Sequence, residues 1–144
     1  MMNSDTNNRL KEARIALKGA ARCVVYNETG LHTSEERGIR PMILWLEDDP
    51  EFLRGAAVAD KIVGRAAAMI MIHAGVSEVY ASVISNGALE ALRDAGISCT
   101  YSMTAIAISN RRGDGICPME RAVAPLKEPA EAYRVLREKV FSMN

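Results

Sequence analysis

The stretch GAAVADKIVGRAAAMIMIHAGVSEVYASVIS, residues 55–85, decides the fold class, because an alanine-rich part is followed by a β-branched part. In the first part, apolar residues from Ala59 to Ile70 recur at helical spacing, which predicts a helix of about five turns over 55–75. Gly75 is a typical helix stop. The many small side chains indicate a helix buried on more than one side. The second part, SEVYASVIS, is rich in β-branched residues and predicts a strand.

Working outward, turn and capping signals divide the rest of the chain into elements of ordinary length. Upstream, the expected elements are a helix over 4–20, a β-hairpin over 23–34 and a short helix over 41–49. Downstream, they are a helix over 85–96 capped by Ser85, a strand over 97–108, a helix from Pro118 and a helix over 127–141. A hairpin followed by alternating helices and strands predicts an α/β fold. We expect a three-layer α-β-α sandwich with a mixed sheet that starts with an antiparallel hairpin.

Length and composition limit the classes of protein to which the chain can belong. Its 144 residues suit a single domain over 1–144, with the polar residues 1–8 expected to be disordered. Lys and Arg total 18 and Asp and Glu also total 18, so no net charge favours nucleic acid or a membrane as a partner. Three widely spaced cysteines do not suggest a disulfide framework. With no visible secretory signal, we expect a cytoplasmic protein.

Six blocks of sequence resemble a known protein family. They are CVVYN (23–27), ERGIRP (36–41), GAAVADKIVGRAAA (55–68), VYASVIS (79–85), ALRDAGI (91–97) and NRRGDGICPMERAV (110–123). In this order they resemble the bacterial and archaeal domain-of-unknown-function family eighteen ninety-three, over roughly residues 23–137. That family is grouped with the cytidine-deaminase-like fold and has no established activity. The resemblance therefore implies a cytidine-deaminase-like fold and no particular reaction.

The deaminase resemblance raises the question of zinc. Zinc deaminases carry His or Cys, any residue, then Glu at the start of one helix, and Pro-Cys-x-x-Cys at the start of the next. The blocks that we compare with these motifs are Ala59-Asp60-Lys61 and Cys117-Pro118-Met119-Glu120, which keep at most one ligand-type sulfur. A catalytic zinc needs three protein ligands. We therefore expect no metal and no cofactor; a mixed site of Asp60, Cys117 and Glu120 is the alternative, and an unusual one for zinc.

Cys117 is the first candidate for chemistry, because it precedes a helix that Pro118 begins. A thiol at a helix N-terminus feels the positive end of the dipole, and Arg111 and Arg112 add positive charge. Both effects favour the reactive thiolate, so Cys117 is a candidate nucleophile or sulfur-carrying thiol. The alternative is a small residue that fills a buried corner. Cys23 and Cys99, on predicted strands, are expected to be structural.

The glycine-rich loop before Cys117 is a candidate anion site. Gly113 and Gly115 permit positive φ angles and close backbone approach, so free amides there could surround a phosphate. Arg111 and Arg112 are the candidate side-chain contacts to that anion. The alternative is a plain strand-to-helix turn with solvated arginines.

Charged residues in the other family blocks complete the candidate site. Asp60 and Lys61 are expected at the start of the alanine-rich helix, and the family resemblance places them opposite Cys117. Asp60 or Glu120 would act as the acid or base, and Lys61 would contact an anion. Arg37 is a candidate for the rim of the pocket.

Three functional hypotheses stay open, and with them the question of whether the chain is an enzyme. The first is a zinc-independent, deaminase-fold protein that binds a small phosphate-bearing ligand, with nucleotide-derived molecules as candidates and Cys117 as nucleophile. The second is a sulfur-carrier or redox accessory protein that uses Cys117. The third is a non-catalytic, nucleotide-type sensor. A homodimer is also expected, through Met42, Trp45 and the alanine-rich helix.

Overall fold

The computed structural model describes residues 4–110 and 112–142, and its centre is a five-stranded sheet of order β2-β1-β3-β4-β5. The strands are β1 (Cys23–Asn27), β2 (Gly30–Ser34), β3 (Ala57–Val63), β4 (Glu78–Ser85) and β5 (Ser98–Ala105). β1 pairs antiparallel with both β2 and β3, whereas β3, β4 and β5 are parallel to one another. The predicted mixed sheet, with its antiparallel hairpin at the start, is therefore confirmed.

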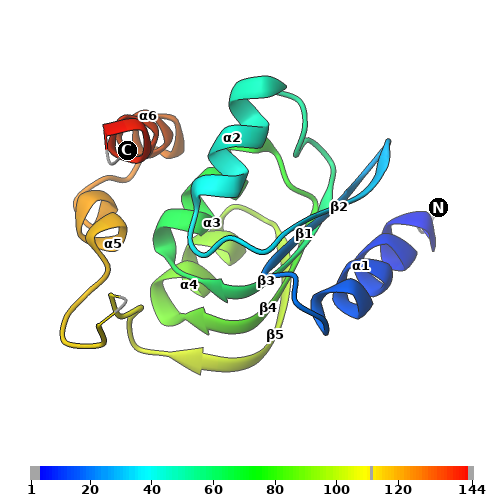
Figure 1. Ribbon diagram of the computed structural model, residues 1–144, viewed down its shortest axis with the longest axis horizontal. Helices are drawn as coiled ribbons and strands as arrows, with labels where there is room; N and C mark the ends of the chain where they lie inside the picture. Colours follow the sequence, from blue (N-terminus) through cyan, green and yellow to red (C-terminus); the bar gives the residue numbers. More distant parts are fainter. Residues whose placement is uncertain (1–3, 111, 143–144) are drawn as a thin grey trace.

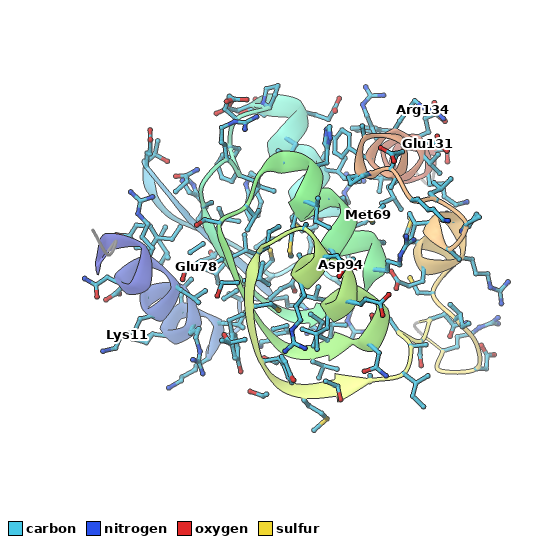
Figure 2. The ribbon with its side chains drawn as sticks, turned by 180° about the vertical axis from the view of Figure 1, so that it is seen from behind. Lys11, Met69, Glu78, Asp94, Glu131 and Arg134 are labelled. Atoms are coloured by element: carbon cyan, nitrogen blue, oxygen red, sulfur yellow. The ribbon has the colours of Figure 1, made fainter. Side chains whose placement is uncertain are left out.

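Helices cover both faces of this sheet (Figure 1). They are α1 (Ser4–Leu17), α2 (Arg40–Asp48), α3 (Arg65–Ala74), α4 (Asn86–Asp94), α5 (Pro118–Val123) and α6 (Pro129–Ser142). α1 packs on one face, against β1, β3 and β4, while α2, α3 and α4 lie on the other. α5 and α6 pack on the outside of α3. Figure 2 shows Glu131 and Arg134 of α6 on the opposite side of the molecule from Lys11 of α1. The α/β, three-layer sandwich predicted from the sequence is confirmed.

The predicted helix over 55–75 is wrong in its first half. Residues 57–63 form the central strand β3, and only 65–74 form the helix α3. Gly64 separates them with an extended backbone, at φ −97° and ψ 179°. A strand that is buried on both faces has a continuous apolar sequence rather than an alternating one, so its pattern resembles that of a buried helix. Asp60 and Lys61 consequently lie on a strand and not at a helix start.

The helix α3 is enclosed on two sides, as its small residues predicted. Its buried residues are Ala66, Ala67, Ala68, Met69, Ile70, Met71 and Ala74. It packs between the sheet and the outer helices α5 and α6. Gly75 ends it in the left-handed conformation, with φ 80°, as expected for a helix stop.

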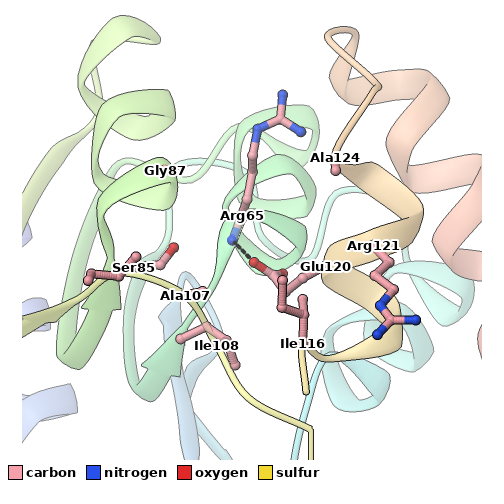
Figure 3. Close-up of a pocket in the computed structure, with 10 residues that line it drawn as sticks. Arg65, Ser85, Gly87, Ala107, Ile108, Ile116, Glu120, Arg121 and Ala124 are labelled. Carbon is pink, nitrogen blue, oxygen red and sulfur yellow. Dashed lines mark hydrogen bonds between the residues drawn. The ribbon is translucent and has the colours of Figure 1, made fainter. Parts of the chain in front are cut away.

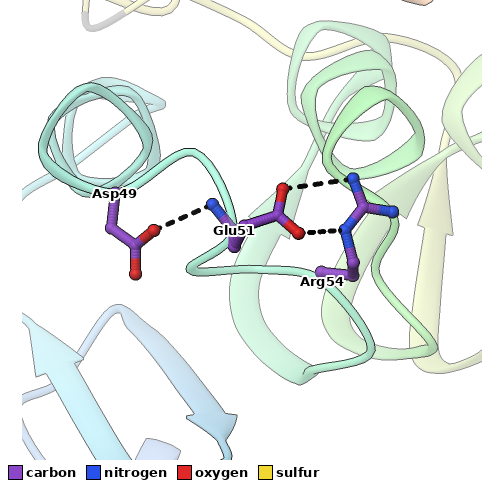
Figure 4. Close-up of polar contacts among 3 residues, drawn as sticks. All are labelled: Asp49, Glu51 and Arg54. Atoms are coloured by element: carbon purple, nitrogen blue, oxygen red, sulfur yellow. Dashed lines mark hydrogen bonds and ion pairs between the residues drawn. The ribbon is translucent and has the colours of Figure 1, made fainter.

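The connection from α2 to β3 is a compact polar turn (Figure 4). Asp49 accepts a hydrogen bond from the Glu51 amide at 3.0 Å, and the Glu51 carboxylate receives two bonds from the Arg54 guanidinium. All three side chains are exposed to solvent, so the ion pair contributes little to stability.

The surfaces expected to support a dimer are largely covered. Met42 is 1% exposed, and the alanine-rich helix α3 is buried. Trp45 is half-buried and stacks on Phe52, with the ring centroids 5.2 Å apart. The dimer itself stays a prediction. In the part of the chain that the structure describes, no helix has the length and apolar character needed to cross a membrane.

Because α6 packs on α3, truncating the buried Leu136 of α6 should cause a large loss of stability. Leu136 is fully buried in the main core cluster. Leu136→Ala should lower the free energy of unfolding by about 2–5 kcal/mol, because it removes buried methyl groups and leaves a cavity. Arg134→Ala, at an exposed position on the same helix, should change it by less than about 1 kcal/mol. Urea unfolding of both variants measures the difference; equal effects would contradict the assigned packing.

Candidate functional site

The candidate site lies at the edge of the sheet where β3, β4 and β5 end. These parallel strands all run to the same edge, and α3 and α4 begin there directly after β3 and β4. A pocket of about 240 Å³ opens at this edge (Figure 3). Its described lining residues are Arg65, Ser85, Gly87, Ile106, Ala107, Ile108, Ile116, Glu120, Arg121 and Ala124. We refer to it as the carboxyl-edge pocket.

The start of α4 forms one wall of the pocket. Ser85 is 3% exposed, and its hydroxyl accepts a hydrogen bond from the Ala88 amide at 3.1 Å. This is the N-cap that the sequence predicted. Gly87, in the first turn of α4, adds no side chain to this wall, so the backbone itself lines the pocket.

Glu120 caps α3 from a distant part of the chain. Its two carboxylate oxygens accept hydrogen bonds from the amides of Arg65 and Ala66, each at 2.8 Å. A Cβ at position 64 would lie only 2.7 Å from this carboxylate, so the close approach requires Gly64. Both oxygens of Glu120 therefore already have partners at the start of α3, where they satisfy amides that lack an intrahelical acceptor. Its predicted role as an acid or base stays untested.

Arg65, the first residue of α3, in turn donates hydrogen bonds to the segment that carries Glu120. Its guanidinium donates to the carbonyl of Val123 and, at 2.6 Å, to the carbonyl of Leu126, just beyond α5. In Figure 3 its side chain extends along the pocket wall toward Ala124. Arg121 lines the pocket from α5 and is exposed. Arg121 was not among the candidate residues of the sequence analysis, although it lies one position after Glu120.

The glycine-rich loop closes on itself. The Asn110 side-chain oxygen accepts from the amides of Gly113, at 2.8 Å, and Asp114, at 3.3 Å. Gly113 has the predicted positive φ, 76°. Arg112 is exposed and lies 3.6 Å from the Asp114 carboxylate, and Arg111 lies outside the described residues. Two of the amides predicted to hold an anion are thus already paired with Asn110.

Gly115 and Cys117 complete this segment. An added Cβ at Gly115 would lie 3.4 Å from the side-chain nitrogen of Asn110, at the edge of ordinary van der Waals contact. Cys117 stands at the N-cap of α5, as predicted, and its own amide donates to the Ile108 carbonyl at 3.0 Å. The cysteine is half-buried and is not among the pocket-lining residues. A reactive thiol at this position stays a prediction.

Asp60 lies in a different environment from Glu120 and Cys117. It is 7% exposed and stands opposite Cys23 in the register of β1 and β3. Burial raises the pKa of Asp60 to about 7, although the backbone amides of Ile62 and Lys61, the charge of Arg22 and the Cys23 thiol oppose this rise. The pKa of Cys23 is raised well above its usual value by burial and by the neighbouring Asp60 carboxylate. The two side chains form a buried pair on the face of the sheet that α2, α3 and α4 cover.

Lys61 and Arg37 are separate from this pair. The Lys61 ammonium donates to the Gly19 carbonyl, just beyond α1, at 3.0 Å. The described contacts therefore tie Lys61 to the other face of the sheet rather than to Glu120. Arg37 is exposed in the segment between β2 and α2. Among the described candidate residues, Glu120 is the one that lines the carboxyl-edge pocket.

Most of the pocket is lined by residues that were not among the candidate site residues predicted from the sequence. Arg65 follows the end of β3, Ser85 is the last residue of β4, and Gly87 lies just beyond it. The residues 106–108 follow the end of β5. The wrong helix prediction over 55–75 hid the strand-to-helix junction at Gly64 and Arg65. A strand followed by glycine and then a helix was the signal that could have revealed it.

No group of three His, Cys, Asp or Glu side chains within residues 4–110 and 112–142 is arranged to hold a metal ion. Asp60 is paired with Cys23, and the Glu120 carboxylate is bonded to the α3 amides. The mixed site that combines Asp60, Cys117 and Glu120 is thus not assembled by these described side chains.

Comparison with known proteins identifies the family. The sequence model of the family described as "Domain of unknown function (DUF1893)" matches residues 11–140, nearly the whole chain. The chain belongs to the DUF1893 family. The family resemblance noted from the six sequence blocks is therefore confirmed for this DUF1893 protein. None of the curated proteins compared with it matches.

Two solved structures from Thermotoga maritima are similar to this DUF1893 protein. A DUF1893 family protein aligns with TM-score 0.81 and 25% identity, covering 96% of this chain and 92% of the other. A diaminohydroxyphosphoribosylaminopyrimidine deaminase/5-amino-6-(5-phosphoribosylamino)uracil reductase aligns with TM-score 0.44 and 16% identity. That match covers 83% of this chain and 41% of the other. The first similarity agrees with the family assignment, and the second is too weak to carry a functional argument.

The raised pKa of Asp60 predicts a distinctive pH dependence of stability. An aspartate in the unfolded chain titrates near pH ~4, whereas the folded Asp60 titrates at about 7. Between these values the folded state holds a proton that the unfolded state has lost, so Asp60 makes the free energy of unfolding fall as pH rises from ~4 to ~7. Asp60→Asn cannot titrate and should remove this fall.

Urea unfolding of wild type and Asp60→Asn at pH ~4.5 and ~8 provides the measurement. The variant should gain stability relative to wild type at the higher pH, by an amount on the order of a few kcal/mol. At the lower pH the two proteins should be much closer. A difference that does not change with pH would contradict the assigned burial of the Asp60 carboxylate.

Proposed function

We propose that this DUF1893 protein binds a small phosphate-bearing ligand in the carboxyl-edge pocket. The observation that carries the proposal is the position of the pocket, at the shared end of three parallel strands and beside the first turn of α4. In open α/β sheets, ligands bind in crevices outside the carboxyl ends of the strands. Helix N-termini at this edge favour anionic groups.

The polar side of the pocket suits an anion. The first amides of α4 have no intrahelical acceptor, and Ser85 satisfies only the amide of Ala88. Arg121 adds an exposed guanidinium, which can form paired hydrogen bonds to a phosphate. The chain has no net charge, so the attraction for an anion would be local to this wall.

The apolar side and the size of the pocket narrow the class of ligand. Ile106, Ile108 and Ile116 supply branched aliphatic side chains next to the polar wall. The volume, about 240 Å³, is below the range of about 300–1,000 Å³ typical of drug-sized ligands. The pocket therefore suits a phosphate with one small organic group, such as a sugar phosphate or part of a nucleotide.

Binding has more direct support than covalent catalysis. Both oxygens of Glu120 are bonded to the α3 amides, and Cys117 does not line the pocket. The nucleophile and sulfur-carrier hypotheses both require the Cys117 thiol at the bound molecule, whereas the non-catalytic sensor does not. We retain a zinc-independent function as part of the proposal, and metal analysis of the purified protein tests it.

Filling the pocket should abolish binding. Ala107 lines the pocket and is exposed, so Ala107→Trp should block it without disturbing the core. Ala130→Trp, at an exposed alanine on α6, is the matched control. Calorimetric titration with inorganic phosphate, ribose 5-phosphate and adenosine monophosphate should show binding of at least one compound to wild type and to Ala130→Trp. Absence of binding by wild type, or equal binding by Ala107→Trp, would contradict the proposal.

The thiol of Cys117 should be dispensable for binding. Cys117→Ser keeps the size of the side chain and the N-cap position, so we expect the dissociation constant for the bound phosphate compound to change less than about twofold. The same titration measures it. A loss of tenfold or more would place the thiol in the site and favour the nucleophile hypothesis.

A further inference from the structure

We propose that the segment 116–126, here called the α5 arm, is a movable wall that gates the carboxyl-edge pocket and is latched to the body by Arg65 and Glu120. The arm contains α5 and the residues on either side of it. That the arm controls ligand access rests on the proposed function, whereas the contacts of Arg65 and Glu120 that form the latch do not depend on it.

The arm has little apolar attachment to the body. Within the described part of residues 106–131, Val123 is the one residue that is fully buried. Met119 and Leu126 are half-buried against the core. Segments with few buried apolar contacts open at a free energy below that of global unfolding. The arm therefore depends on polar contacts to stay closed.

Those polar contacts form a reciprocal latch. The arm's Glu120 carboxylate binds two backbone amides at the start of α3, each at 2.8 Å. In return, the guanidinium of Arg65 at the same helix start binds the arm's carbonyls at Val123 and Leu126. All four bonds involve a charged side chain, and such bonds are stronger than neutral ones. One residue pair thus fixes the middle and the end of the arm, whereas its start is held by the Cys117 amide, which donates to the Ile108 carbonyl.

Gly64 is part of the latch because it leaves room for the carboxylate. An added Cβ there would lie 2.7 Å from three Glu120 atoms, closer than real contacts allow. Gly64 has an extended backbone that other residues also adopt, so alanine introduces little backbone strain. Gly64→Ala should therefore release the latch without changing its charged residues.

Opening of the latch would remove one side of the pocket. Ile116, Glu120, Arg121 and Ala124 belong to the arm, whereas Ser85 and Gly87 belong to the body. A molecule bound between them would contact both sides and shift the population toward the closed arm. The same coupling means that release of the arm would weaken binding.

A buried thiol label measures the opening. Val123→Cys places a thiol at the buried anchor of the arm, and Ala132→Cys places one at an equally buried position on α6. Peptide-resolved mass spectrometry after alkylation distinguishes these positions from the natural cysteines. In native buffer, position 123 should be alkylated at least about tenfold faster than position 132, because its exposure requires only local opening.

Latch variants in the Val123→Cys background then test the mechanism. Glu120→Ala and Gly64→Ala should each raise the alkylation rate at position 123 by at least about tenfold, since each removes two charge-assisted bonds. Neither should change the rate at position 132 in the Ala132→Cys background. Glu131→Ala, which removes an exposed carboxylate from α6, is the control and should change neither rate. Circular dichroism confirms that each variant is folded.

The outcomes separate the gate from the proposed function. Equal rates at positions 123 and 132 in the Val123→Cys and Ala132→Cys proteins, or no effect of either latch variant, would overturn the gate. If ribose 5-phosphate binds wild type, it should slow alkylation at position 123 and bind Glu120→Ala at least about tenfold more weakly. Unchanged affinity in Glu120→Ala would overturn the coupling of the arm to the pocket. If no phosphate compound binds but the latch variants act as expected, the proposed function fails and the movable arm stands.

Discussion

The arrangement of this protein depends on the close approach of the Glu120 carboxylate to the backbone at Gly64. At this point the central strand ends, the buried helix begins and a distant segment joins the body. A side chain on residue 64 would exclude the carboxylate, and the first amides of α3 would then be unsatisfied near the core. Gly64 therefore joins β3 to α3 and also leaves the space that the pocket-lining residue Glu120 occupies.

A second constraint is the burial of α3 between the sheet and the outer helices. Alanine side chains allow the sheet and α6 to approach the helix closely, and Met69, Ile70 and Met71 fill the remaining space. The outer helices are therefore part of the core rather than an addition to it. α5 has one buried residue, Val123, whereas α6 has three, and α5 is also held by the charged side chains of Glu120 and Arg65. This contrast explains why the carboxyl-edge pocket has one firm wall and one wall that we propose to be movable.

The buried pair of Asp60 and Cys23 has a cost for the folded state. A carboxyl group in this position is stable when protonated and unfavourable when charged, as its pKa of about 7 indicates. An aliphatic residue would fit a central strand with no such penalty. Asp60 lies in the middle of β3, and neither side chain lines the pocket.

The sequence by itself determined the α/β class, the opening hairpin, the Ser85 cap, the helix stop at Gly75 and the family, because these depend on local pattern and on ordered motifs. It also placed Cys117 correctly at a helix start.

The sequence did not distinguish β3 from a helix, because a strand buried on both faces loses its alternation of apolar and polar residues. Only the tertiary structure decided that Glu120 meets Gly64, that Lys61 bonds to the chain just beyond α1 and that Asp60 pairs with Cys23. Such contacts join residues far apart in the chain, and sequence spacing carries no measure of their distance in space.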